Sequence, residues 1–279
     1  MTITNSDVLL IKKARPFLKW AGGKSQLLPE LRKHIPAKFK TYYEPFVGAG
    51  AFFFDLAPKT AVLGDTNEAL IDLYKTLRLE HPLLVRILLD LADKYNADPS
   101  TYYYVARRKF IESKSSEEKA ALFLFLNKTC FNGLYRVNKS GDFNTSWGKR
   151  AEFTVDVKNL LACHAALKDA QIVYSDFTQS VDPARNGDLV YFDPPYVPLT
   201  KTANFTGFTK ERFNHDDQIL LRDTALRLKK RGVHVILSNS DTAITRELYA
   251  GFAIHPVRSS RAINSVGTSR GSVGELIIT

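Results

Sequence analysis

The chain has 279 residues, 44% of them hydrophobic, which is enough for one large domain or for a core domain carrying a smaller inserted one. No apolar run reaches the roughly 18 residues of a membrane span, and the first residues lack a secretory signal pattern, so a cytoplasmic protein without a membrane partner is expected. Cys130 and Cys163 show no CxxC spacing and the six histidines are scattered, which argues against a disulfide framework and against a bound metal.

The charge balance is basic, with 39 Lys and Arg against 29 Asp and Glu and a formal net charge of +10. This balance favours a polyanionic partner, although many basic proteins bind none. Two segments concentrate the charge. Residues 12–24 hold five basic side chains and no acidic one, and residues 258–270 carry three arginines among small polar residues. Both patterns are typical of arms that lie along nucleic-acid phosphates.

Short β-prone segments alternate with helical patterns along the chain. A helix is predicted from Asn214, a suitable N-cap, to Arg231, just before the stop residue Gly232. The alternation predicts an α/β fold with a mostly parallel, Rossmann-like sheet covered by helices on both faces. Seven strands are predicted, at residues 42–46, 61–65, 171–176, 188–193, 233–239, 252–257 and 274–279.

Between the second and third predicted strands lie about 105 residues, where one crossover of roughly 15 to 20 would suffice. An insertion is therefore expected there. It shows helical patterns at 82–95, 99–113 and 117–129, and then a polar stretch rich in glycine and asparagine at 131–150. Lys139–Asp142 is a turn signal within that stretch, which predicts a basic β-hairpin on a helical platform, suited to probing a DNA groove.

The first motif with chemical content is EPFVGAG at residues 44–50, between a predicted strand and a helix. Glycines there let the backbone approach a ligand at the carboxyl end of the sheet, where open α/β folds bind ligands. A dinucleotide site would need a small residue at position 53, where this chain has Phe53. Asp65 ends the next strand, where a carboxylate can accept hydrogen bonds from ribose hydroxyls. The pattern favours a nucleoside without phosphates over an ordinary glycine turn beside a surface aspartate.

The second motif, Asp193-Pro194-Pro195-Tyr196, follows a predicted strand and is rare by chance. It suits a planar amine, which is a poor nucleophile. The Asp193 carboxylate and the Pro194 carbonyl can accept the two amine hydrogens and direct the nitrogen lone pair toward a donor. The prolines hold that carbonyl rigidly, and Tyr196 offers a flat face to a base. This chemistry requires no raised pKa of Asp193, whose alternative role is a helix cap or loop carboxylate.

With these motifs the chain resembles the Dam family of DNA adenine methyltransferases, which includes members of restriction-modification systems. The similarity runs nearly end to end and in the family's order. The blocks are FLKWAGGKSQLL at 17–28, EPFVGAGAFFFDL at 44–56, FNGLYRVN and GDFN within 131–144, YFDPPYVPL and ANFTGF within 191–208, and LSNSDT at 237–242.

The resemblance implies a methyltransferase that moves a methyl group from S-adenosylmethionine to the N6 nitrogen of an adenine flipped out of double-stranded DNA, at GATC sites. It implies a catalytic domain made of residues 1–80 and 151–279, with a target-recognition domain at 81–150. A cognate restriction endonuclease is a candidate partner. Neither Cys130 nor Cys163 follows a proline or ends a strand, so ring-carbon methylation through a thiolate is disfavoured.

Position by position, the resemblance implies roles for individual residues. Catalysis falls to Asp193, Pro194, Pro195 and Tyr196. Contact with S-adenosylmethionine is implied for Trp20, Lys24, Glu44, Phe46, Gly48, Gly50, Asp65, Asp176, Phe177 and Asp193. Contact with DNA is implied for Lys19, Phe131, Asn132, Leu134, Arg136, Asn138, Ser146 and Arg150.

Within the DNA set, Lys19 is expected at the first base of the site and Phe131 in the stack vacated by the flipped base, and an arginine such as Arg136 suits guanine. Ser146 and Arg150 stand where the best-known members have Pro and Tyr, a departure that bears on the GATC assignment. From the residues alone, Phe131 could instead close the core of the platform. Trp20 could likewise be a core aromatic, and Lys19, Lys24 and Arg136 could be solvated charges.

Two other functions stay open at this point. The same chemistry could act on an RNA base or on a protein side-chain amide, although the leading aspartate and the long basic insertion argue against an amide. The chain could instead be a DNA-binding regulator with an inactive pocket, against which the intact motifs at 48–50 and 193–196 speak.

Overall fold

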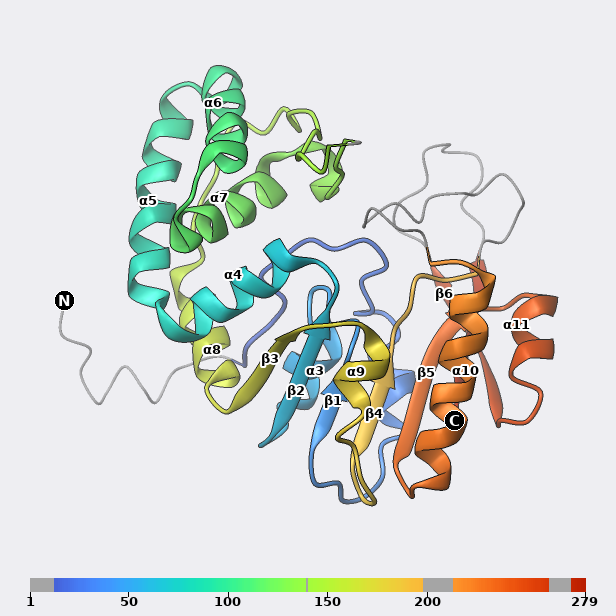
Figure 1. The fold of residues 1–279 in the computed structure, drawn as a ribbon. Coiled ribbons are helices and arrows are strands. Elements are labelled where there is room, and N and C mark those ends of the chain that lie inside the picture. Colours follow the sequence, from blue (N-terminus) through green and yellow to red (C-terminus); the bar gives the residue numbers. More distant parts are fainter. Residues whose placement is uncertain (1–12, 139, 198–212, 261–271) are drawn as a thin grey trace. The chain divides into compact units, whose positions relative to one another are not determined.

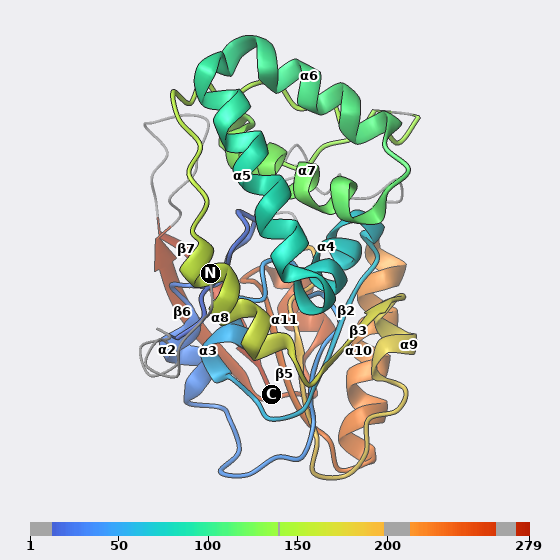
Figure 2. The ribbon, with the colours of Figure 1, turned by 90° about the vertical axis from the view of Figure 1, so that its left-hand side faces the viewer.

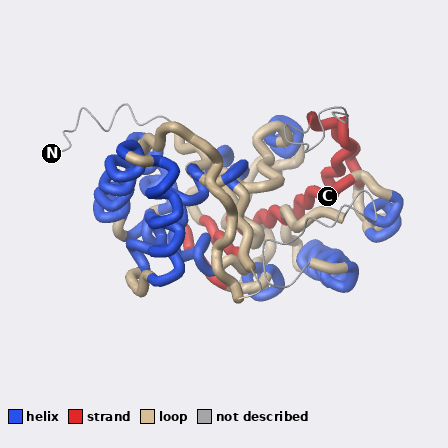
Figure 3. The backbone as a smooth tube through the Cα atoms, turned by 90° about the horizontal axis from the view of Figure 1, so that it is seen from above, coloured by secondary structure: helices blue, strands red, loops and turns tan. Residues whose placement is uncertain are grey.

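The structure, a computed structural model, describes residues 13–138, 140–197, 213–260 and 272–279 (Figure 1). The chain forms two compact units. The sheet unit comprises residues 24–47, 58–66 and 173–279, and the helical unit comprises 1–23, 48–57 and 67–172. Of the described strands, drawn in red in Figure 3, all but Ala170–Tyr174 lie wholly within the sheet unit, and that strand crosses the boundary between the units. The block at 203–208 and most of the predicted arm at 258–270 lie outside the described residues.

Within the described ranges, the sheet has seven strands in the order β3-β2-β1-β4-β5-β7-β6. β1 pairs in parallel with β2 and β4, β4 pairs in parallel with β5, and β7 runs antiparallel to β5 and β6. All seven predicted strands and the mostly parallel α/β fold are confirmed, with strand ends that differ by at most three residues. The strands are β1 Tyr42–Glu44, β2 Ala61–Asp65, β3 Ala170–Tyr174, β4 Leu189–Phe192, β5 His234–Ser240, β6 Ile254–Ser260 and β7 Ser272–Ile278.

The central strand β4 is buried along its whole length, as expected of a parallel strand covered on both faces. Its side chains alternate, so that Val190 and Phe192 join a core cluster with residues of α9 (Phe177–Val181) and α10 (His215–Lys230). Figure 2 shows α9 and α10 on one side of the sheet and α2 (Leu28–Arg32) on the other. The other helix among the described residues of the sheet unit is α11 (Ala243–Leu248).

The start of α10 is fixed by a capping box. The Asn214 side chain accepts from the Asp217 N–H at 3.1 Å, and the Asp217 carboxylate accepts from the Asn214 N–H at 2.7 Å. The helix ends just before Gly232, whose φ of +79° favours glycine. Both predicted ends of this helix are therefore confirmed.

The helical unit confirms the three helices predicted in the insertion, at α5, α6 and α7. Helix α7 packs against α4, α5 and α6, so its residues 120–126 are almost fully buried on every side. The helices of this unit are α3 Ala51–Leu56, α4 Glu68–Leu79, α5 His81–Ala97, α6 Pro99–Glu112, α7 Ser116–Thr129 and α8 Val157–Leu167, with a 3₁₀ turn, η1, at Phe131–Gly133.

The predicted hairpin at 131–150 is less regular than a pair of strands. The turn is present, because the Asn138 N–H donates to the Asp142 carbonyl at 2.9 Å and Gly141 has a φ of +91°. Between the described residues, the two arms pair antiparallel through isolated bridges, Cys130 with Trp147 and Val137 with Phe143. A continuous ladder does not form because η1, with Asn132 in the left-handed region, interrupts the first arm.

Candidate active site

The site lies where the sheet changes direction. From β1 the chain continues outward to β2 and β3, and from β4 it continues to β5 on the other side. Such a switch point leaves a crevice at the carboxyl ends of the two central strands. Asp193 follows β4 directly and Phe46 lies two residues past β1, so the sheet brings parts of both predicted motifs to this edge.

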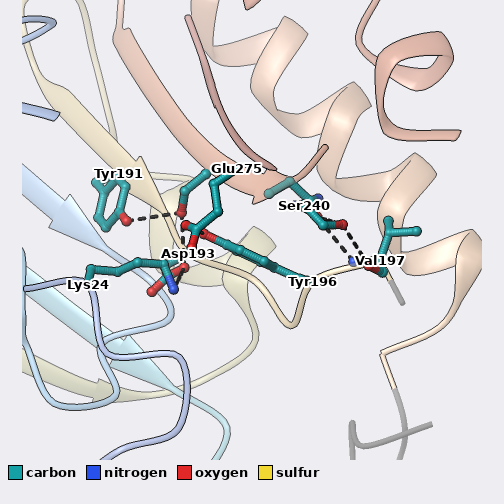
Figure 4. A network of polar contacts seen from close by, with 9 residues as sticks. Lys24, Tyr191, Asp193, Tyr196, Val197, Ser240 and Glu275 are labelled. Carbon is teal, nitrogen blue, oxygen red and sulfur yellow. Dashed lines mark hydrogen bonds and ion pairs between the residues drawn. The ribbon is translucent and has the colours of Figure 1, made fainter. Parts of the chain in front are cut away.

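Asp193 is held by two contacts to the same carboxylate oxygen. Lys24 Nζ lies 2.9 Å from Asp193 Oδ1, and the Ser238 hydroxyl donates to that oxygen at 3.0 Å (Figure 4). Ser238 Oγ also lies 3.0 Å from the Tyr191 hydroxyl, a second contact that holds the serine side chain. Among the described residues, no group donates to Asp193 Oδ2, and the side chain stays 19% exposed. One carboxylate oxygen is thus anchored and the other can accept a substrate hydrogen.

Burial raises the pKa of the Asp193 carboxyl above its ordinary value. The Lys24 ammonium and the Ser238 hydroxyl oppose this shift because both favour the ionised carboxylate. The chemistry inferred from the sequence does not require a raised pKa of Asp193, but in the structure this pKa is raised. The shift makes Asp193 a better proton acceptor than an exposed aspartate.

Tyr196 is anchored at its hydroxyl and covered by a cation. The hydroxyl donates to Glu275 Oε2 at 3.1 Å, and Lys24 Nζ lies 4.5 Å from the ring centroid. Burial, followed by the charge of Asp193, raises the pKa of Tyr196 well above its usual value, so the phenol stays a donor. Because Lys24 lies over one face of the ring, a planar ligand would have to stack on the other face.

The loop that follows β4 is tied down through its backbone. Gln218 Nε2 of α10 donates to the Pro195 carbonyl at 2.9 Å, and Ser240 Oγ of β5 donates to the Val197 carbonyl at 2.6 Å (Figure 4 shows the latter). The Val197 N–H donates to Asn239 Oδ1 at 3.1 Å. Within the described part of the chain, the Pro194 carbonyl accepts no hydrogen bond. Both predicted acceptors, Asp193 and the Pro194 carbonyl, thus keep open acceptor capacity.

Two carboxylates lie at the same edge, on the other side of the switch point. Asp65 ends β2, and the N–H of Ser175, which follows β3, donates to the Asp65 carbonyl at 3.3 Å. Asp176 caps α9, because its Oδ1 accepts from the N–H of Thr178 at 2.7 Å. Carboxylates suit ribose hydroxyls or a base amine and would repel a phosphate, which agrees with a nucleoside ligand.

Three aromatic rings lie beside these carboxylates. Phe46 stacks on Phe177 with centroids 5.4 Å apart, and Phe213 packs edge-on to Phe46 at 5.8 Å. Glu44 is buried at the end of β1 and accepts from the Tyr42 hydroxyl at 2.8 Å. A planar apolar group such as an adenine would find aromatic neighbours here.

The helical unit holds the other residues predicted to contact the cofactor. Gly48 has a φ of +46°, and a Cβ there would lie 2.7 Å from Trp20 Cδ1, so glycine lets the indole approach the backbone. Trp20 also stacks on Tyr135 with centroids 6.2 Å apart. Gly50, with a φ of +65°, precedes α3 and packs against Tyr74. These contacts show Trp20 in an aromatic cluster of its own unit.

Lys19 lies beside the loop that carries Phe131. Its N–H donates to Asn127 Oδ1 at 2.9 Å, and a Cβ on Gly133 would lie 2.7 Å from Lys19 Cβ. Burial, and then the charge of Arg150, lowers the pKa of Lys19. The structure thus brings Lys19, Phe131 and Arg150 into one neighbourhood.

The remaining predicted DNA contacts are mostly exposed. Phe131 is 54% exposed and Leu134 is 37% exposed, which does not fit a role for Phe131 in the core. Arg136 donates from Nε to Asn144 Oδ1 at 2.9 Å. Asn138 stabilises the turn by accepting the N–H groups of Ser140 and Asp142. The side chains of Asn132, Ser146 and Arg150 are exposed as well.

Five residues around the catalytic loop were missed by the sequence reasoning. They are Gln218, Ser238, Asn239, Ser240 and Glu275, and all but Glu275 are buried. The block LSNSDT pointed to three of them without a role. Among the described residues no group of three or more His, Cys, Asp or Glu side chains could hold a metal ion. No described helix is both long and apolar enough to cross a membrane.

Comparison with known proteins identifies the family of this chain. Residues 20–263 match the family described as D12 class N6 adenine-specific DNA methyltransferase. The chain is 38% identical to a type II methyltransferase of Lactococcus lactis subsp. cremoris over 273 residues, 95% of each chain. It is 39% identical to a type II methyltransferase of Methanocaldococcus jannaschii, over 95% of this chain and 99% of that relative. It is 36% identical to the DNA adenine methylase of Escherichia coli K12, over 96% of this chain and 95% of that relative.

Proposed function

Because this chain belongs to the D12 class of N6 adenine-specific DNA methyltransferases, we propose that it transfers the methyl group of S-adenosylmethionine to an adenine flipped out of double-stranded DNA. The observation that carries the proposal is the pair of open acceptors after β4. Asp193 Oδ2 and the Pro194 carbonyl are adjacent in the chain and, among the described residues, neither accepts a hydrogen bond.

These two acceptors match the two hydrogens of an exocyclic amine. When both are engaged, the nitrogen lone pair is drawn out of conjugation with the ring and is directed away from the acceptors. The amine nitrogen becomes acidic only once it is alkylated, and it then loses one of its own hydrogens as a proton. Asp193, with its raised pKa, is placed to take that proton. Tyr196, held by Glu275, supplies the face on which the base stacks.

The residues of the sheet unit fit S-adenosylmethionine, which when bound supplies an electrophilic methyl group on a sulfonium. Asp65 and Asp176 offer carboxylate oxygens for hydroxyl or amine hydrogens, and Phe46 and Phe177 offer aromatic surface. Glu44 lies at the same edge, at the end of β1. Contacts from Lys24 and, in the helical unit, from Trp20, Gly48 and Gly50 complete the proposed binding set.

Residues 81–150 are proposed as the target-recognition domain, with residues 1–80 and 151–279 as the catalytic domain. Exposed side chains on an irregular hairpin can reach base edges, and Phe131 is an exposed aromatic of the size needed to fill a vacated stack. We propose GATC as the site, with Lys19, Asn132, Leu134, Arg136 and Asn138 in contact with DNA. The exposed Ser146 and Arg150 are the positions at which specificity would depart from it.

The test is transfer of tritium from labelled S-adenosylmethionine to duplex DNA, with Asp193→Ala as the inactive control. We expect label in adenine, and sequencing of modified bases in DNA from expressing cells should find GATC. Faster labelling of RNA than of duplex DNA would mean that RNA is the substrate. DNA binding without any methyl transfer would indicate a DNA-binding regulator. The cognate restriction endonuclease remains a prediction, and an extract that cuts unmodified but not modified DNA would support it.

A further inference from the structure

We infer that Gln218 and Asn239 are positioning residues that decide which carbonyl of the catalytic loop faces the substrate amine. The catalytic loop here means residues 193–197. The inference rests on the proposed function and adds the means by which the Pro194 carbonyl is kept open. Neither side chain belongs to the predicted catalytic or binding sets.

Three hydrogen bonds run in series through these two side chains. Gln218 Nε2 donates to the Pro195 carbonyl at 2.9 Å. Gln218 Oε1 accepts from Asn239 Nδ2 at 3.1 Å, and Asn239 Oδ1 accepts from the Val197 N–H at 3.1 Å. We call this series of three hydrogen bonds the relay. It begins at the Pro195 carbonyl and ends at the Val197 N–H, two residues apart on the backbone of the catalytic loop.

The backbone ends fix the orientation of both amides. A carbonyl can only accept and an N–H can only donate, so Gln218 must present Nε2 to Pro195 and Asn239 must present Oδ1 to Val197. The two inner atoms then match as donor and acceptor. Gln218 is 4% exposed and Asn239 is 0% exposed, so water cannot replace a missing partner.

The relay determines what the loop offers to a substrate. The Pro195 carbonyl is used by Gln218, and the Val197 carbonyl is used by Ser240 at 2.6 Å. Among the described residues the Pro194 and Tyr196 carbonyls accept nothing, and of these two Pro194 directly follows Asp193, so we assign the Pro194 carbonyl to the amine. Without the relay the peptide between Pro195 and Tyr196 could rotate and change the direction of the neighbouring Pro194 carbonyl and of the Tyr196 ring.

The experiment compares Gln218→Leu with Gln218→Glu in single-turnover methyl transfer to duplex DNA. Leucine cannot donate, so we expect a rate about 10- to 100-fold below wild type, the loss of one buried hydrogen bond. A glutamate carboxylate also cannot donate, but its protonated form can donate to Pro195 and accept from Asn239. Burial raises the pKa of such a carboxyl, so the rate of Gln218→Glu, relative to wild type, should rise as pH falls.

Dividing the rate of each variant by the wild-type rate at the same pH removes the effect that titration of other groups has on the rate. On α10 the nearest of these groups along the chain are His215, Asp216, Asp217 and Arg222. In and around the loop they are Asp193, Tyr196, Asp241 and Glu275, and residues 235–240 of β5 contain none. Gln171→Glu, on an exposed side chain of β3, is the matched control and should show no pH-dependent change relative to wild type.

Asn239→Asp gives a second route if Gln218→Leu fails to fold. This variant keeps the acceptor for the Val197 N–H and, when ionised, loses the donor to Gln218. We therefore expect the same loss of methyl-transfer rate at high pH, and recovery of the rate at low pH, where the protonated carboxyl can donate to Gln218. Calorimetry with S-adenosylmethionine alone should give an unchanged affinity for all variants, because the relay does not touch the cofactor residues.

A wild-type rate in Gln218→Leu would overturn the inference. So would equal rates of the Leu and Glu variants at every pH, or loss of cofactor affinity in a folded variant, since both outcomes indicate packing alone. If wild-type protein leaves duplex adenine unlabelled, the proposed function fails instead, so the two failures are distinguishable.

Discussion

The catalytic loop of the sheet unit and the hairpin region of the helical unit differ in how firmly their side chains are held. Asp193, Tyr196 and the carbonyls of Pro195 and Val197 are held by hydrogen bonds with side chains of α10, β5 and β7. In the hairpin region, Phe131 is 54% and Leu134 is 37% exposed, and among the described residues Arg136 has one side-chain hydrogen-bond partner, Asn144. Chemistry on one amine needs fixed groups, whereas reading a base sequence needs side chains that can meet a partner.

The largest expected effect is at Asp193. Asp193→Ala should lower the single-turnover rate by about 10³-fold or more, because one of two preorganised acceptors is lost. DNA binding, measured by gel shift, should stay within a few-fold of wild type. Asp193→Asn, of nearly equal volume, is the control for packing around Lys24 and should be similarly inactive. An unchanged rate in either variant would remove Asp193 from catalysis.

In the hairpin region, Arg136→Ala should relax specificity at one base pair by about 1–3 kcal/mol, or roughly 5- to 150-fold. Rates on a set of duplexes with single substitutions in the site measure this. The melting temperature should not change, because Arg136 is exposed. A uniform loss of rate on all duplexes would mean that Arg136 contacts phosphates and not a base.

Tyr196→Phe tests how much the hydrogen bond from the catalytic loop to Glu275 of β7 contributes to stability. The ring remains for stacking, but the hydrogen bond to Glu275 is lost, so stability should fall by about 1 kcal/mol. Denaturant unfolding measures the change, and Phe213→Leu, in the neighbouring aromatic cluster, serves as a comparison without loss of a hydrogen bond. No change in stability would show that the contact with Glu275 is not formed in solution.

The smallest effect concerns the pH dependence of the rate. Lys24 opposes the burial that raises the pKa of Asp193, so Lys24→Met should raise that pKa further. A raised pKa means that the carboxylate is lost at a higher pH, so the acid limb of the rate profile should move upward in pH while the alkaline plateau persists. The profile is taken with saturating S-adenosylmethionine, since Lys24 is also a proposed cofactor contact. Movement of the limb to lower pH would contradict the assigned direction.

The strands, the α10 cap and the buried helix α7 followed from sequence because each depends on neighbouring residues. The alternation of β-prone segments and the pair Asn214 and Gly232 are local signals. The place of β7 between β5 and β6 could not be predicted, because an edge strand and an inner strand have similar apolar patterns. The interruption of the hairpin at Asn132 depends on the left-handed backbone conformation of this one residue, which lies in a stretch rich in turn-forming residues. The sequence therefore did not indicate it.

The candidate site was predictable for residues within motifs and not for the residues that hold them. Asp193 and Tyr196 are recognisable because their neighbours along the chain carry the signal. Gln218 and Glu275 touch the same loop from sequence separations of 23 and 79 residues, and a lone glutamine or glutamate gives no local sign of this. Pairings of this kind are a property of the fold, and no short window of sequence contains them.

The pairing of β1 with β4 has a consequence for the order of folding. The Thr41 N–H bonds to the Asp188 carboxylate across 147 positions of the chain, so this central register forms only after a very long loop has closed. The contacts of α5, α6 and α7 span far shorter separations. In pulse-labelled hydrogen exchange during refolding, amides of these three helices should gain protection first and those of β4 last, so enzymatic competence should be the final property that the refolding protein acquires.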